Sequence, residues 1–213
     1  MNSLFTFHRY FGYIFSMRTL IIIPVLLFSL LLGVPSYSAD FNKGLTAAQS
    51  GDFATALKEW KPLAGQGDAD AQTNLGLMYQ NGWGVPQDDK EAVYWYKLAA
   101  EQGDAKAQYN LGVMYDVGEG VPQDDKEAVR WYTLAAEQEH AKAQYNLGVM
   151  YALGEGVIKD YVYAHMWGNI ASMNENDKGE TLRGYVAEKM TSSQIEEAQR
   201  LARECVKKNY KGC

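Results

Sequence analysis

Residues 71–106 read AQTNLGLMYQNGWGVPQDDKEAVYWYKLAAEQGDAK, and residues 107–142 follow directly as AQYNLGVMYDVGEGVPQDDKEAVRWYTLAAEQEHAK. The two segments are identical at 27 of 36 positions. A third copy opens at Ala143 with AQYNLGVMYALGEGV and then diverges, and a shorter copy precedes residue 71. Self-similarity at a fixed period of about 20–50 residues is typical of stacked repeat arrays. The sequence therefore predicts that copies of one small unit pack side by side.

Each copy reads as two helices joined by a loop that contains two glycines and a proline. Ala71, Leu75, Gly76 and Tyr79 recur at steps of three and four residues, which indicates a buried helical stripe. A glycine recurs in the middle of this helix at 76, 112 and 148, where it costs about 1 kcal/mol relative to alanine. We expect the partner helix to approach there so closely that no Cβ fits.

Several residues predict where the helices begin and end. Aspartates precede the second helices, and the spacings Asp88–Glu91 and Asp124–Glu127 predict capping boxes. Pro62 predicts that the second helix of the first pair, expected at 53–64, ends early or bends.

One unit cannot bury its apolar face alone, so the copies must stack. The predicted fold is all-α: a right-handed α-solenoid of antiparallel helix pairs with capping helices at the carboxy terminus. The expected cap has a helix at about 180–190 and a last helix that follows a capping box at Thr191–Gln194. The predicted units are a shorter pair at 39–70, repeats at 71–106, 107–142 and 143–177, and the cap at 178–213.

The first 38 residues predict a signal peptide. The run LIIIPVLLFSLLL, residues 20–32, follows Arg18 and is shorter than the roughly 20 residues of a membrane span. Small residues favour cleavage after Ser38, and Met17 is a plausible alternative start. An uncleaved anchor is the alternative. With cleavage, no stable membrane span is expected, and the location is periplasmic or secreted.

The distribution of charge narrows the class of partner that the chain can bind. Residues 39–177 carry 10 basic and 21 acidic side chains, whereas residues 178–213 carry 8 and 5. Because an acidic body repels phosphate, nucleic-acid binding is disfavoured.

The two cysteines, Cys205 and Cys213, are eight residues apart and in an oxidising compartment can close a disulfide. Metal ligation and two free thiols are the competing readings.

The repeated positions resemble the Sel1-like repeat family, a relative of the tetratricopeptide repeat with a longer loop between its helices. The residues that carry the resemblance are Ala107, Leu111, Gly112, Tyr115, Gly118, Gly120, Val121, Asp124, Ala128, Trp131, Tyr132, Ala135 and Ala136. The resemblance implies a helical scaffold that binds proteins or peptides on its inner face. Some cysteine-rich members are associated with β-lactam binding or hydrolysis. Residues 39–178 contain no cysteine, so that activity is not carried over.

The sequence contains no recognisable combination of catalytic residues. His140 lies in a turn between repeats and is expected at the surface, and His165 is expected to pack inside beside Trp167. The chain has no HExxH, CxxC or SxxK motif, so no metal or cofactor is predicted. The paired aspartates at 88–89 and 124–125 are read as helix caps.

The resemblance places the first helix of each pair on the concave side of the array. The candidate peptide-binding groove is then lined by Leu77, Gln80, Tyr109, Val113, Asp116, Tyr145 and Val149. The alternative is that Tyr109 and Tyr145 only pack on neighbouring repeats. The recurring Asn74, Asn110 and Asn146 are expected to hydrogen-bond between repeats.

These observations predict an exported repeat scaffold that binds a protein or peptide partner without catalysis. A cell-envelope enzyme that acts on peptidoglycan or a β-lactam is the first alternative. A secreted effector that binds a host protein is the second.

Overall fold

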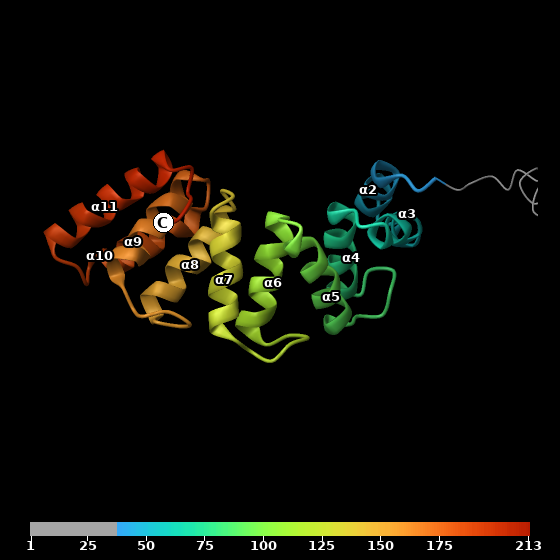
Figure 1. Cartoon of the computed structure of the whole chain (residues 1–213), viewed down its shortest axis with the longest axis horizontal. Helices are drawn as coiled ribbons and strands as arrows, with labels where there is room; N and C mark the ends of the chain where they lie inside the picture. The colour runs from blue at the N-terminus through green and yellow to red at the C-terminus, as the bar shows by residue number, and fades with distance from the viewer. Residues whose placement is uncertain (1–37) are drawn as a thin grey trace, which may run out of the picture. The chain divides into compact units, whose positions relative to one another are not determined.

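The computed structural model describes residues 38–213, and residues 39–213 form one compact unit (Figure 1). The predicted signal peptide lies outside the described residues. Within them the fold is all-helical, with ten helices and no strand. The helices are α2 (Phe41–Gln49), α3 (Phe53–Gly65), α4 (Ala69–Asn81), α5 (Asp89–Glu101), α6 (Ala105–Val117), α7 (Asp125–Ala136), α8 (Ala141–Leu153), α9 (Tyr161–Met173), α10 (Asp177–Ala187) and α11 (Ser192–Lys207). No helix of this part of the chain is long and apolar enough to cross a membrane.

Consecutive helices pack as pairs: α2 with α3, α4 with α5, α6 with α7 and α8 with α9. We call α2, α4, α6 and α8 the first helices and α3, α5, α7 and α9 the second helices. Each of the first three second helices also packs on the first helix of the next pair, so the pairs stack in chain order (Figure 1). The predicted stacking of helix pairs is confirmed.

Aspartate caps begin most of the helices, as predicted, but the capping boxes at Asp88 and Asp124 were a wrong prediction. Each carboxylate accepts hydrogen bonds from two backbone N–H groups of the following helix. The backbone N–H of each cap residue, however, donates to the carbonyl of Tyr79 or Tyr115 at 3.0 and 2.9 Å. That donor is therefore unavailable to Glu91 or Glu127. A complete capping box forms at Thr191 with Gln194.

Two predicted helix boundaries also differ from the structure. α3 does not end early at Pro62 but continues to Gly65, and the alternative, a bend at Pro62, stays a prediction. A proline in the last turn removes only one intrahelical hydrogen bond, which is the reason the helix tolerates it. α10 begins at Asp177, before the predicted start, because the side chain of Asn176 caps it by accepting from the N–H of Lys178.

The glycines in α4 and α6 make room for aromatic rings, whereas a Cβ at Gly148 of α8 would lie 2.8 Å from Leu182 of α10. A Cβ at Gly76 would lie 2.5 Å from the ring of Tyr96, and one at Gly112 would lie 2.7 Å from the ring of Tyr132. Both tyrosines are fully buried. The expected close approach is therefore present, and in α4 and α6 a side chain of the second helix makes it.

A buried glutamine in each repeat joins neighbouring repeats. The side-chain amides of Gln72, Gln108 and Gln144 donate to the carbonyls of Ala64, Ala100 and Ala136 at 3.0, 3.1 and 3.1 Å. Their oxygens accept from the side-chain amides of Gln102, Gln138 and Asn174 at 2.7, 2.8 and 2.9 Å. We call this series the glutamine ladder. It provides hydrogen bonds between repeats in addition to the one expected of Asn146, whose side chain hydrogen-bonds Tyr132 of the preceding repeat.

The carboxy-terminal segment covers the last second helix. Both α10 and α11 pack on α9. A disulfide joins Cys205 to Cys213, with a Cα–Cα distance of 5.5 Å. The N–H of Gly212 donates to Glu137 at 2.9 Å, and Lys211 pairs with the same carboxylate at 3.7 Å. The end of the chain is thereby fastened to α7.

Candidate binding surface

The first helices leave one narrow side uncovered. In α4 the residues on this side are Asp70, Asn74, Leu77 and Asn81, which are half-buried or exposed and lie at steps of four, three and four residues. Such steps keep side chains on one face of a helix. The equivalent residues are Lys106, Asn110, Val113 and Val117 in α6 and Lys142, Asn146, Val149 and Leu153 in α8. We call these three rows the open face.

The open face is apolar towards the loop ends of the helices. Val117 and Leu153 are 54% and 53% exposed, and Leu77, Val113 and Val149 are half-buried. Single exposed apolar residues are ordinary, but a row that continues from one repeat to the next is characteristic of an interaction surface.

The predicted groove residues divide into two groups. Leu77, Val113 and Val149 lie on the open face, and each also packs on a core cluster with part of its side chain. The other four make hydrogen bonds or ring contacts within the array: Gln80, Asp116, Tyr109 and Tyr145.

Gln80 and Asp116 hold buried tyrosines of their own pairs. The hydroxyl of Tyr96 donates to the Gln80 side-chain oxygen at 2.7 Å, and the hydroxyl of Tyr132 donates to Asp116 at 3.0 Å. Burial raises the pKa of both tyrosines, and the negative charge of Asp116 raises the pKa of Tyr132 further. The hydroxyls therefore remain protonated donors, and their acceptors are engaged in the fold.

Tyr109 packs towards the following repeat, and Tyr145 packs on its own helix pair and on α10, in agreement with the alternative interpretation that these rings pack within the array. The ring of Tyr109 stacks on His140, with 4.6 Å between the ring centroids. Tyr145 packs on the cluster of Ala152, Ala164, Leu182 and Val186. Both side chains are half-buried.

The two histidines have structural environments. The Nδ1 atom of His140 caps α8 by accepting from the N–H of Ala143 at 3.3 Å, and burial lowers the pKa of this histidine. His165 is 3% exposed, and its Nδ1 has no hydrogen-bond partner among the described residues. Burial, and then the positive charge of Arg183, lower the pKa of His165. In residues 38–213 no group of three or more metal-ligating side chains comes together.

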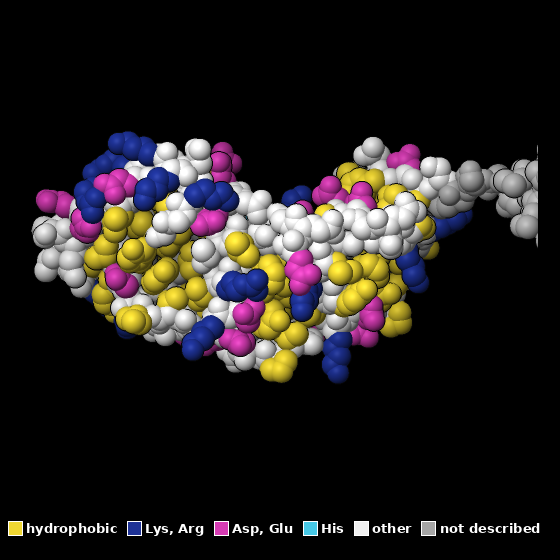
Figure 2. All heavy atoms as spheres, in the orientation of Figure 1, with side chains coloured by type: hydrophobic (Ala, Val, Ile, Leu, Met, Phe, Trp, Pro, Cys, Tyr) yellow, Lys and Arg dark blue, Asp and Glu magenta, His cyan; other side chains and the backbone are white. Residues whose placement is uncertain are grey.

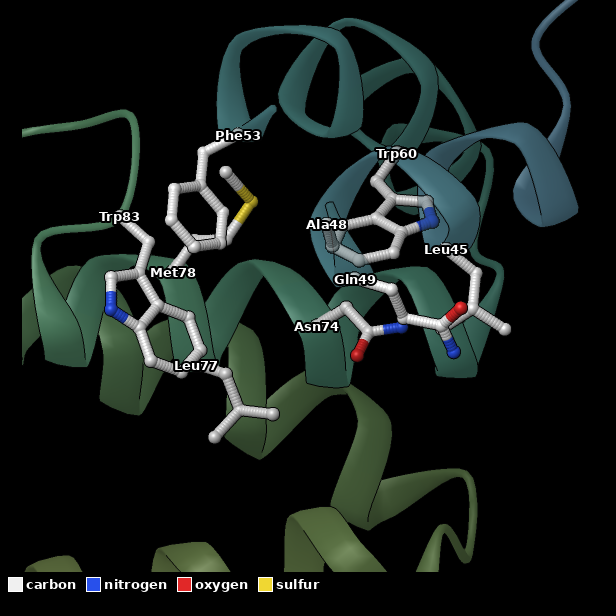
Figure 3. Close-up of a pocket in the computed structure, with 9 residues that line it drawn as sticks. All are labelled: Leu45, Ala48, Gln49, Phe53, Trp60, Asn74, Leu77, Met78 and Trp83. Carbon is white, nitrogen blue, oxygen red and sulfur yellow. The ribbon is translucent and has the colours of Figure 1, made fainter. Parts of the chain in front are cut away.

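A pocket of about 260 Å³ opens between the first two helix pairs. It is lined by Leu45, Ala48 and Gln49 of α2, Phe53 and Trp60 of α3, Asn74, Leu77 and Met78 of α4, and Trp83 of the loop after α4. Figure 3 shows Phe53, Met78 and Trp83 on one side of it and Trp60 and Leu45 on the other. The pocket therefore extends the apolar part of the open face.

Sequence reasoning identified Leu77 but missed the rest of this pocket. The sequence did contain one indication of the pocket, at a loop position where the repeats differ in residue type. Trp83 stands where the later copies have Glu119 and Glu155, so an apolar side chain interrupts a series of acidic ones.

The comparisons identify the repeat. The family model described as the Sel1 repeat matches residues 69–104, 105–140 and 141–176. No curated protein matches the chain.

Two solved structures are similar to it. One is c5321, a protective antigen of uropathogenic Escherichia coli strains that displays an SLR fold. It has a TM-score of 0.69 and 30% identity over 78% of this chain, which spans 41% of that protein. The other is a Sel1 repeat protein from Oxalobacter formigenes, with a TM-score of 0.62 and 30% identity over 78% of this chain and 75% of that one. The three matched repeats cover half of the sequence, and the chain belongs to the Sel1 repeat family.

Proposed function

We propose that this protein is an exported scaffold that binds a protein or peptide partner on its open face and has no catalytic activity of its own. The Sel1 repeat is commonly a scaffold for protein–protein interactions. The observation that carries the proposal is the row of partly exposed apolar side chains, continuous over three repeats and joined to a pocket. Extended surfaces of this kind suit an elongated ligand better than a small substrate.

The arrangement of polar groups supports binding over catalysis. Enzymes that use a nucleophile need a base within hydrogen-bond reach and a cleft that holds both. Here the half-buried hydroxyl and carboxylate groups near the open face bond to one another, and His140 caps a helix. For an envelope hydrolase to use these hydroxyl, carboxylate and imidazole groups in catalysis, their hydrogen bonds within the fold would first have to break.

Three features support export. Residues 20–32 have the length and composition of a signal-peptide core. The compact unit begins at residue 39, and a disulfide is present, which suits an oxidising compartment. An intact mass of protein from the envelope fraction tests this. We expect the mass of residues 39–213 less two hydrogens, and a mass that retains residues 1–38 contradicts export with cleavage.

A capture experiment tests the binding face. The double variant Val117→Asp/Leu153→Asp places charges on the open face, and Tyr94→Asp places one on a second helix. The three side chains are 54%, 53% and 54% exposed, so the variants are matched in exposure. We expect the parent and Tyr94→Asp to capture the same partner from envelope extract and the double variant to lose it, with unchanged circular dichroism. Loss of the partner in Tyr94→Asp alone would refute the assignment to the open face.

A further inference from the structure

The junction between the first two helix pairs differs in chemistry from the two that follow. At each junction the loop after a first helix lies on the start of the preceding second helix. Gly84 lies against Phe53, Gly120 against Asp89, and Gly156 against Asp125. Because these contacts repeat, the residues at each position can be compared directly.

The first junction has a pair of aromatic residues at the positions where the second and third junctions have pairs of acidic residues. Phe53 and Trp83 stack with 5.3 Å between ring centroids and an angle of 8° between the rings. The equivalent residues are Asp89 with Glu119 at the second junction and Asp125 with Glu155 at the third. Trp83 is nonetheless 43% exposed. A ring of this size that is only partly covered leaves apolar surface available to a partner.

The pocket beside this pair is built for one large apolar group. Its volume of about 260 Å³ is below the roughly 300–1,000 Å³ of sites for small molecules and cofactors. Trp60, one of its walls, donates its indole N–H to the carbonyl of Phe41 at 3.2 Å, so that polar group is already satisfied. The amides of Gln49 and Asn74 are the polar side chains of the lining. A partner's side chain that enters the pocket therefore contacts aromatic rings and aliphatic carbons. The two amides can hydrogen-bond to the partner's backbone.

The surface that continues from the pocket is acidic. The loops after α4, α6 and α8, taken with the first turn of the helix that follows each, span residues 82–91, 118–127 and 154–163 and carry net charges of −2, −3 and −1. We call these three segments the acidic linkers. Asp89 and Asp125 accept only from the side chains of Gln87 and Gln123, at 3.4 and 3.1 Å, and no described cation pairs with them. Glu119 and Glu155 are exposed. Figure 2 shows a group of Lys and Arg side chains over α11, and others beside acidic side chains over the middle of the molecule.

We infer that the pocket receives one aromatic or long aliphatic side chain of a peptide segment whose neighbouring residues are Lys or Arg, and that these lie along the acidic linkers. The inference rests on the proposed function, since it names the chemistry of the partner at the same open face. The apolar anchor supplies contact area in a desolvated pocket, and the basic residues supply complementarity of charge.

Defined peptides test this with the purified protein and fluorescence anisotropy. The first probe is a fluorescein-labelled 12-residue peptide with one Trp followed by four Lys or Arg residues among Gly and Ser. The second replaces the Trp by Ala, and the third replaces the basic residues by Glu. We expect the first probe to bind about tenfold or more tightly than either of the others at low salt, with the advantage of its basic residues falling as salt is added.

Two substitutions, each taken from the equivalent position of a later repeat, test whether the probe binds at the pocket. Trp83→Glu and Phe53→Asp install the residues of the equivalent positions, and Trp83→Phe keeps a ring. We expect the first two to weaken the first probe by about tenfold or more and Trp83→Phe to retain most of the binding. Glu119→Gln/Glu155→Gln is expected to weaken it a few-fold and to reduce its salt dependence. Tyr94→Glu, on a second helix, is the control and should leave binding unchanged.

The outcomes separate this inference from the proposed function. Equal binding of the first and third probes, no binding of the first, or binding unaffected by Trp83→Glu overturns the inference. If a natural partner is lost in Val117→Asp/Leu153→Asp but retained in Trp83→Glu, the open face is the binding surface and the pocket is not its anchor. If neither variant affects capture, both the proposed function and the inference fail.

Discussion

The glycine in the middle of each first helix is a packing residue. Gly76 and Gly112 lie against the rings of Tyr96 and Tyr132, and each ring is held by its hydroxyl as well as by its contacts. The helix-propensity cost of about 1 kcal/mol is therefore offset by the burial of an aromatic side chain. The same arrangement occurs at Gly44 with Trp60, where a Cβ would lie 2.5 Å from the indole.

We predict that Gly112→Ala lowers the free energy of unfolding by about 1–2 kcal/mol. Its Cβ would lie 2.7 Å from the buried ring of Tyr132, and overpacking of this kind outweighs the gain in helix propensity. Gly184→Ala is the matched control, because Gly184 is also helical but a methyl group there would have nothing within 4 Å. It should raise stability by up to about 1 kcal/mol. Urea unfolding followed by circular dichroism measures both, and equal effects would refute the packing role.

His165 makes the stability of the last helix pair depend on pH. Its folded-state pKa is lowered by burial and by Arg183, whereas the unfolded chain has a pKa near 6.5. As the pH falls below about 6.5 the unfolded state binds the proton first, so the free energy of unfolding must fall.

We predict that His165→Val reduces this loss between pH 7.5 and 5. Valine is the matched choice because Val93 and Val129 occupy the equivalent positions. Unfolding midpoints in urea at several pH values provide the measurement. His140, whose pKa is also lowered, retains its own contribution in this variant. An identical pH profile in parent and variant would show that His165 does not titrate in this range.

At the scale of elements, the glutamine ladder holds the repeats in register. Gln108 donates to the last turn of the preceding second helix and accepts from the end of its own pair. Its side chain is 4% exposed, so Gln108→Ala removes a buried side chain and both of its hydrogen bonds. The carbonyl of Ala100 still accepts from the N–H of Gly103, and the amide of Gln138 still donates to the carbonyl of Gly103. A repeat-to-repeat contact thus includes directional bonds as well as apolar packing.

Removal of one rung is predicted to lower the free energy of unfolding by about 1–3 kcal/mol, because two hydrogen bonds of about 0.5–1.5 kcal/mol each are lost. Gln108→Ala is the test, and Gln199→Ala on the exposed side of α11 is the control, expected to change stability by less than about 0.5 kcal/mol. Hydrogen exchange should locate the loss at α5 and α6. A Gln108 variant as stable as the control would show that the ladder is dispensable.

The sequence predicted most elements because the repeat supplied several copies of each signal. A cap or a glycine that recurs every 36 residues indicates a structural requirement that a single occurrence does not. The failures came where a residue had a competing partner. Asp88 and Asp124 lost the second half of a capping box to backbone carbonyls, and Gln80 and Asp116 bonded to tyrosine hydroxyls.

At the scale of the whole molecule, the fold could be predicted and the candidate binding surface only in part. Leu77, Val113 and Val149 follow from the resemblance to the Sel1-like repeat family, which implies that the first helices line the concave side. The pocket does not, because it depends on a shorter link between α2 and α3 and on the stacking of Phe53 with Trp83. Contacts between residues 30 positions apart are set by how the repeats stack, which periodicity within one helix does not determine.

The central claim is that the partner lies on the open face, and direct cross-linking tests it most closely. A photoreactive benzoylphenylalanine placed at Val117 or at Tyr94 samples two positions of equal exposure, one on the open face and one on a second helix. Irradiation in the cell envelope should give a cross-linked protein from position 117 and none from position 94. A product from position 94 alone, or the same product from both, would contradict binding at the open face.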